Sequence, residues 1–167
     1  LVFAGDGEYK YDFLKMPDGN TLIYIGDGDE TDTNGDSYIY KYENGDLKEL
    51  VDIDKLFKFY IGDVENVVVD GNEIYADMKE GDAAGIGFLS MRVALSYNGE
   101  SITRDGDTYK VLWIQNLNCK KVTKLKTAKK LKLYSDKTGK KIKKTIPAGT
   151  TLKIKKRYEK SHKCQGI

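Results

Sequence analysis

The sequence predicts an all-β protein built from antiparallel hairpins. Aromatic, β-branched and polar residues alternate in short stretches such as 9–14 and 38–42, and this two-residue period is typical of β-strands. Turn sequences such as Asn44-Gly45 separate these stretches. The turn glycines recur at intervals of 26, 26 and 28 residues, at Gly19, Gly45, Gly71 and Gly99. Such regular spacing indicates a repeated hairpin unit.

Four hairpins are expected in the first two thirds of the chain. They lie at 9–25 around a turn at 17–20, at 38–51 around Asn44-Gly45, at 67–76 around a turn at 70–72, and at 93–103 around Asn98-Gly99. Asn44-Gly45 predicts a type I′ turn, in which both central residues have positive φ. The stretch 52–61 fits either a short helix or a strand.

Pairs of hairpins make larger units. Two hairpins give four strands in about 50 residues, which is close to the length of one blade of a β-propeller. Two such units cannot close a propeller ring. We therefore expect either two blades of a longer propeller or two sheets that bury one apolar face of each in a sandwich.

Charge divides the chain into two parts. Residues 1–111 contain ten Lys or Arg and 24 Asp or Glu, so their net charge is −14. Residues 112–167 contain 18 Lys or Arg and two Asp or Glu, so their net charge is +16. One compact core rarely shows such a division. We expect an acidic hairpin domain at 1–111, a connection at 112–118 and a basic domain at 119–167. Because opposite charges attract, docking of the two domains within the chain is also expected.

The basic domain has its own strand pattern. Apolar residues and lysines alternate from Val122 to Tyr158, which predicts a small barrel whose strands have one apolar and one cationic side. The apolar strand 111–114 precedes it and contains Trp113, which we expect in the core. The lysines could bind phosphates, anionic lipid or nucleic acid, or they could neutralise the acidic domain. We favour neutralisation, and nucleic acid is not expected because few aromatic residues accompany the lysines.

The basic domain resembles the bacterial Src-homology-3-like (SH3-like) domain, a module of many cell-wall and secreted proteins. The similarity rests on L-K-L-Y-S-D at 131–136, the turn at 138–139, the strand 142–146 and P-A-G-T-T-L-K-I at 147–154. It implies a small SH3-like barrel. The family's final aromatic strand and G-W ending have no counterpart before Ile167, so this barrel is expected to be incomplete or to continue further. Some members bind wall peptides through aromatic side chains in regions that are absent or altered here, so the resemblance does not imply that activity for this chain. Tyr134 and Tyr158 remain as the candidate ligand contacts.

The acidic domain resembles blades of the FG-GAP and VCBS type, which occur in extracellular β-propeller modules. The similarity rests on T-L-I-Y-I at 21–25 and S-Y-I-Y-K-Y-E-N-G-D-L-K-E-L at 37–50, with an acidic loop between them. In that family an acidic loop before the first strand holds calcium. The matching position here, 16–20, lacks most of the carboxylates.

A different loop is the candidate calcium site. Calcium binds six to eight oxygen atoms, and a short loop rich in Asp, Asn and Gly supplies them. The candidate ligands are Asp27, Asp29, Asp32, Asn34 and Asp36. The loop lacks the glycine position and the final Glu of an EF-hand. The alternative is a solvated acidic loop that discourages pairing between sheet edges.

No catalytic constellation is recognisable. The one histidine, His162, lies two residues from Cys164, and no third group is evident that would orient such a pair. The stretch 81–87 contains a G-x-G at 85–87, but the third glycine of a dinucleotide-binding loop does not follow it, and the lysine of a P-loop is also missing. Cys119 and Cys164 bracket the basic domain without a C-x-x-C zinc motif, and they either form a disulfide or remain reduced.

These observations together favour a non-enzymatic binding or anchoring protein on the outside of a bacterial cell, with a cell-wall polymer, a glycan or a protein as partner. A calcium-dependent glycan- or protein-binding module and an unrecognised hydrolase are the alternatives. No cofactor other than calcium is expected. The chain has no apolar run of about 18 residues that could span a membrane, and it begins with Leu1. We expect a processed product or fragment, with a secretion signal or lipid anchor on a preceding segment.

Overall fold

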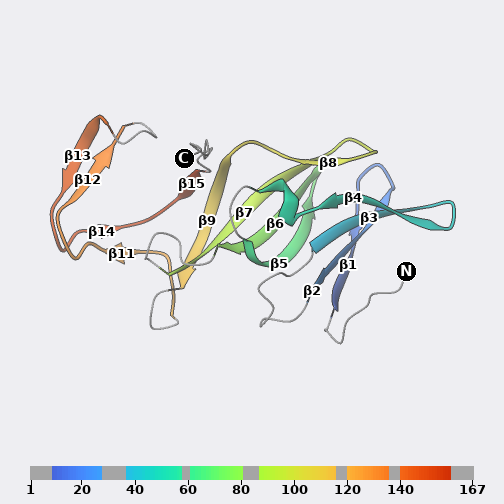
Figure 1. Ribbon diagram of the computed structural model, residues 1–167, viewed down its shortest axis with the longest axis horizontal. Coiled ribbons are helices and arrows are strands. Elements are labelled where there is room, and N and C mark those ends of the chain that lie inside the picture. Colours follow the sequence, from blue (N-terminus) through green and yellow to red (C-terminus); the bar gives the residue numbers. More distant parts are fainter. Residues whose placement is uncertain are drawn as a thin grey trace, which may run out of the picture.

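The computed structural model describes residues 9–27, 37–57, 61–80, 87–115, 120–135 and 140–158. Almost all regular structure in these residues is β, and every strand pair is antiparallel, so the predicted fold class is confirmed (Figure 1). One short 3-10 helix, η1 (Asp54–Leu56), lies in the stretch whose pattern fitted either a helix or a strand. No helix of the described residues has the length and hydrophobicity needed to cross a membrane.

The first sheet contains the first two predicted hairpins. Its strands are β1 (Tyr9–Lys15), β2 (Thr21–Asp27), β3 (Ser37–Glu43) and β4 (Asp46–Asp52), and they lie in sequence order. The turn between β3 and β4 has φ values of 54° at Asn44 and 94° at Gly45, which confirms the type I′ prediction. The turn between β1 and β2 is closed by hydrogen bonds from the Met16 amide to the Asn20 carbonyl, 2.9 Å, and from the Gly19 amide to the Met16 carbonyl, 3.0 Å.

The second sheet contains the other two predicted hairpins and part of the basic segment. Its main strands are β5 (Ile61–Asp70), β6 (Glu73–Glu80), β7 (Phe88–Tyr97) and β9 (Thr108–Gln115), and β8 (Ile102–Arg104) pairs with β7. Two short strands of the basic segment, β10 (Lys121–Val122) and β15 (Lys156–Tyr158), both pair with β9. Acidic and basic segments therefore share one sheet.

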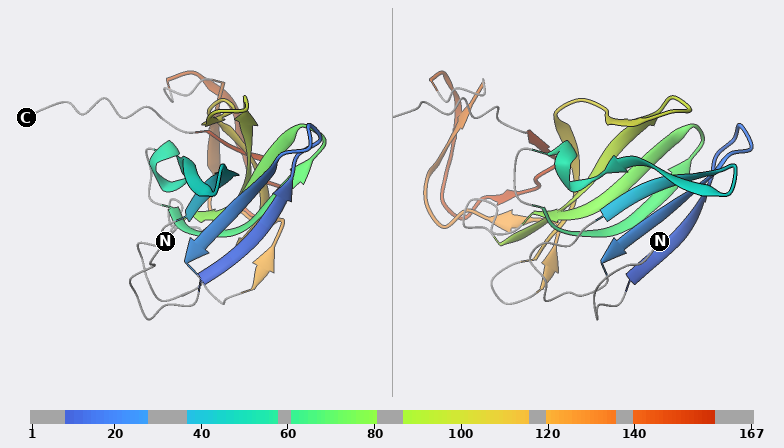
Figure 2. Two further views of the ribbon diagram at one scale, coloured as in Figure 1. Left: turned by 90° about the vertical axis from the view of Figure 1, so that its right-hand side faces the viewer. Right: turned by 45° about the vertical axis from the view of Figure 1, so that its right-hand side comes forward.

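The two sheets enclose a common core (Figure 2). The inner faces contribute Leu22, Tyr24 and Ile39 from the first sheet and residues such as Ile74, Met78 and Met91 from the second, all of them buried. The Tyr24 hydroxyl donates a hydrogen bond to the Val64 carbonyl, 3.4 Å, and so links β2 to β5. Burial of this apolar surface is the main source of the fold's stability.

Trp113 departs from the expected core position. It is half-buried on β9, and the Lys121 ammonium nitrogen lies 4.3 Å from the centre of its ring. The ring therefore packs under a cation instead of entering the apolar core. An indole face attracts a cation through its electron-rich π system, which explains why this position tolerates solvent.

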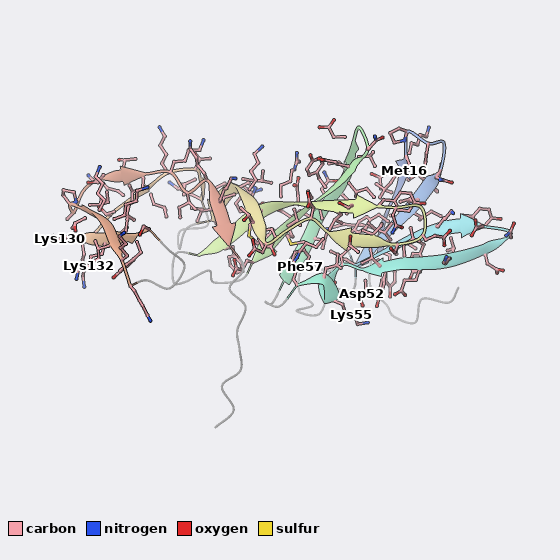
Figure 3. The ribbon with its side chains drawn as sticks, turned by 90° about the horizontal axis from the view of Figure 1, so that it is seen from above. Met16, Asp52, Lys55, Phe57, Lys130 and Lys132 are labelled. Atoms are coloured by element: carbon pink, nitrogen blue, oxygen red, sulfur yellow. The ribbon has the colours of Figure 1, made fainter. Side chains whose placement is uncertain are left out.

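The rest of the basic segment forms an extended basic arm, which we define as residues 123–135 and 140–155. It consists of two strand pairs, β11 (Leu125–Lys126) with β14 (Thr151–Leu152), and β12 (Leu131–Tyr134) with β13 (Ile142–Ile146). The described residues do not close into a barrel, and the arm projects away from the two sheets (Figure 1). Lys130 and Lys132 lie at the far end of the molecule from Met16 (Figure 3).

Candidate functional site

The predicted calcium ligands lie almost entirely outside the described residues. Asp29, Asp32, Asn34 and Asp36 belong to 28–36, and of Asp27 only the backbone is described, at the end of β2 opposite Tyr9. Within the described ranges, no group of three or more His, Cys, Asp or Glu side chains is arranged to hold a metal ion. His162, Cys119, Cys164 and residues 81–86 also fall outside these ranges. The calcium site therefore stays a prediction.

The two predicted ligand-binding tyrosines are on separate sheets. Tyr134 lies on β12 in the basic arm, paired with Ile142, and its side chain is 44% exposed. Tyr158 lies on β15, opposite Thr108 at the edge of the second sheet, and its side chain is outside the described set. The strand pairing thus does not bring the two residues into one site.

The clearest candidate site is the outer face of the first sheet. Alternation along β1 and β3 places one set of residues inward and the other outward. Leu14, Leu22 and Ile39 fill the inward positions and are buried. Three aromatic residues on β1 and three on β3 occupy the outward positions, and we call them the aromatic face: Tyr9, Tyr11, Phe13, Tyr38, Tyr40 and Tyr42.

Several rings of the aromatic face are open to solvent. Tyr11 is 72% exposed, Phe13 57% and Tyr42 62%. Tyr11 and Phe13 make an edge-to-face contact with ring centres 6.2 Å apart, and Tyr38 and Tyr40 are 5.9 Å apart. Large aromatic side chains exposed together on one face of a small protein commonly mark a binding surface.

A shallow hollow of about 480 Å³ lies at one end of the aromatic face. It is lined by Phe13, Gly19, Asn20, Thr21, Ile23 and Tyr42. Ile23 pairs with Phe13 on one side and with Tyr40 on the other, so β2 forms the floor between the aromatic residues of β1 and β3. The hollow combines apolar walls with an amide and a hydroxyl group, a composition typical of small-ligand sites.

The β1–β2 turn fixes the polar rim of this hollow. Asp18 accepts hydrogen bonds from the Asn20 backbone amide, 2.9 Å, and from the Asn20 side-chain amide, 2.8 Å. These bonds favour the ionised carboxylate and lower the pKa of Asp18 below its usual value. Gly19 has a φ of +89°, a conformation that glycine adopts without strain. The Asn20 side chain is therefore held in place beside the hollow.

The sequence contained a signal for this face. In Y-K-Y-D-F at 9–13 and Y-I-Y-K-Y at 38–42 the aromatic residues are two apart, so each set had to share one side of its strand. Alternation alone did not say which side is buried, since Leu14 and Ile39 on the opposite side are equally apolar. Only the packing of the two sheets decides that the aliphatic side faces inward.

Comparison of the chain with protein-family models, with curated proteins and with solved structures finds no match. The chemistry of the site therefore rests on its own geometry: an open row of aromatic rings beside oriented hydrogen-bonding groups.

Proposed function

We propose that the chain is a non-enzymatic binding module that acts on the outside of a bacterial cell and holds a glycan strand on its aromatic face. The observation that carries this proposal is the hollow between Phe13 and Tyr42, with Asn20 and Thr21 on its rim. A sugar ring has an apolar face of C–H groups and an edge of hydroxyl groups. The aromatic rings can pack against the C–H face of the sugar, and the amide and hydroxyl groups can form hydrogen bonds with its hydroxyl groups.

The open shape of the site supports a polymer over a small metabolite. The hollow is shallow, and the aromatic residues continue beyond it along β1 and β3 to Tyr9 and Tyr38. A chain of sugars could contact several rings in succession, whereas a small molecule would leave most of the face unused. The location outside the cell is supported by the resemblance of the two segments to extracellular modules.

The test is a binding measurement with defined glycans. Binding of oligosaccharides of N-acetylglucosamine and of purified cell-wall sacculi should be measured for the wild type and for a Phe13→Ala/Tyr42→Ala variant. Aromatic contacts contribute about 0.5–1.5 kcal/mol each, so we expect the double variant to bind about tenfold or more weakly. Both side chains are largely exposed, and thermal melting should confirm that the variant is folded.

Tyr134→Ala is the matched control because this tyrosine is also exposed but lies in the basic arm. It should bind the same glycans with unchanged affinity. If Tyr134→Ala abolishes binding while Phe13→Ala/Tyr42→Ala does not, the aromatic face is not the site, and a site in the basic arm around Tyr134 is the better explanation.

A further inference from the structure

A second surface hollow lies on the outer face of the second sheet, and its side chains differ from those of the aromatic face. Its volume is about 400 Å³. Seven residues line it, and we call it the cationic groove: Asp70, Tyr75, Arg92, Ala94, Thr108, Lys110 and Lys156. These residues come from β5, β6, β7, β9 and β15, so both the acidic and the basic segments build the groove.

Ala94 explains why there is a hollow at this point. It lies on β7 opposite Tyr75 of β6, and Arg92 is the next residue of β7 on the same face. The neighbouring positions of the groove carry much longer side chains, which stand above the small methyl group. The floor of the groove is therefore alanine, and its walls carry carboxylate, phenol, guanidinium, hydroxyl and ammonium groups.

Three cations lie in one row across three adjacent strands. Arg92 on β7 is directly opposite Lys110 on β9, and Lys110 is directly opposite Lys156 on β15. Side chains at such positions are neighbours, and like charges directly opposite each other destabilise a sheet. Neither lysine forms an ion pair with another described residue. Lys110 and Lys156 thus bring two ammonium groups without an ion-pair partner among the described residues to one side of the groove.

Arg92 is oriented by Asp77. The guanidinium donates from Nε to one carboxylate oxygen at 2.6 Å and from Nη2 to the other at 2.7 Å. An arginine has five N–H groups, so this pair leaves three of them for other acceptors. The guanidinium carbon also lies 5.7 Å from the centre of the Tyr75 ring. Asp77 and Tyr75 together hold one donor group in a fixed position at the side of the groove.

Four carboxylates lie close to the row, and two of them, Glu73 and Asp107, accept hydrogen bonds from the hydroxyls of Tyr75 and Thr108. Asp77 balances Arg92, and Asp70 belongs to the lining, at the end of β5. The strands lie in the order β5-β6-β7-β9, with β15 beyond β9, so Asp70 and Lys156 are on opposite sides of the groove. Asp70 is the only carboxylate among the seven described residues that line the groove, so the side formed by Lys110 and Lys156 contributes cations and no carboxylate to the lining.

We infer that the cationic groove binds a phosphoryl group. Donors approach from three strands: the remaining N–H groups of Arg92 on β7 and the ammonium groups of Lys110 on β9 and Lys156 on β15. A phosphate offers three or more acceptor oxygens in a tetrahedral arrangement, whereas a carboxylate offers two in a plane. Bound phosphate would also relieve the repulsion within the row. This inference is independent of the glycan site.

The first experiment is thermal melting in phosphate and in sodium chloride at equal ionic strength, with calorimetric titration of inorganic phosphate. A ligand that binds the folded state raises Tm. We expect a rise of about 3–5 °C for each tenfold excess of phosphate over its dissociation constant. Equal melting temperatures in the two salts, with no heat of binding, would overturn the inference.

The decisive variant is Lys110→Glu. It replaces a repulsive row by alternating charges, so Tm in phosphate-free buffer should rise while the response to phosphate disappears. A second variant, Ala94→Met, fills the floor without changing any charge and should also remove the response. The double variant Lys130→Gln/Lys132→Gln deletes two cations of the distant arm and is the matched control. A control that loses the phosphate response as completely as Lys110→Glu would show non-specific screening and contradict the proposal.

Vesicles distinguish the source of the phosphoryl group. Flotation with vesicles containing phosphatidic acid, compared with phosphatidylcholine alone, should be measured for the wild type and for Lys110→Glu. Binding that depends on both phosphatidic acid and Lys110 assigns the groove to a lipid headgroup. A phosphate response without vesicle binding assigns it to a soluble or polymer-bound phosphoryl group.

Discussion

The ring of Tyr24 lies over Gly26, so that a Cβ built on the glycine would be only 2.7 Å from Cζ of the tyrosine. Both residues are on the inward face of β2, and Tyr24 is buried. The hydroxyl at the end of this ring donates to Val64 of the opposite sheet. Glycine at position 26 thus allows a tyrosine to lie along its own strand and to join the two sheets.

The first prediction concerns this contact. Gly26→Ala should lower the free energy of unfolding by about 1–3 kcal/mol, because the buried ring must move away from Val64 to make room. Chemical denaturation of the two proteins measures the difference. In a Tyr24→Val background the same Gly26→Ala change should cost much less, since the overlap is gone. An equal cost in both backgrounds would show that the backbone, and not the ring, requires glycine.

The second prediction concerns the ion pair of Arg92 and Asp77. Asp77 is nearly buried, and its two oxygens both accept from the guanidinium. Arg92→Leu leaves that carboxylate without its partner and should destabilise the fold by about 1–3 kcal/mol. Arg92→Leu/Asp77→Leu removes both charges and should be more stable than the single variant. Urea denaturation of the three proteins checks this order.

The third prediction concerns pH. The bonds from Asn20 lower the pKa of Asp18 below 3.8, so the folded turn prefers the ionised carboxylate. Its contribution is complete above the pKa of the unfolded chain and is lost as the pH falls through the lower pKa of the folded state. The chemical shift of the Asn20 amide should titrate with a midpoint below 3.8, and this transition should be absent in Asp18→Asn. A midpoint at or above 3.8 in the wild type would contradict the hydrogen bonding described.

The fourth prediction concerns calcium. If the predicted ligands Asp27, Asp29, Asp32, Asn34 and Asp36 bind calcium, the ion should raise Tm and a chelator should reverse the rise. Asp32→Asn/Asp36→Asn should remove the effect and leave Tm in chelator unchanged. Melting curves of the wild type that coincide with and without calcium would favour the alternative, a solvated acidic loop.

Local chemistry explains what could be predicted from the sequence. The Asn44-Gly45 pair determines its own turn, because few other residues adopt positive φ at two successive positions. Each hairpin follows from a turn and the alternation on either side of it. These signals lie within a single hairpin, and they do not depend on the rest of the fold.

Long-range pairing explains what could not be predicted. Nothing near Lys156 indicates that its strand pairs with Thr108–Lys110, since β15 is only three residues long and its neighbours resemble the rest of the basic segment. The row of Arg92, Lys110 and Lys156 exists only in the folded sheet. The cationic groove could therefore not be predicted from the sequence. The aromatic alternation could be predicted, but it did not show which face of each strand is exposed.

The pairing of β15 with β9 also affects the order in which the protein can form. The hairpins of the first sheet join neighbouring residues, so they can close early, even while synthesis continues. β15 can join β9 only after the whole basic arm has left the ribosome, because the arm lies between them in the chain. The surface that contains Lys110 and Lys156 is thus completed late. A nascent or truncated chain lacking β15 would present the aromatic face while still lacking Lys156.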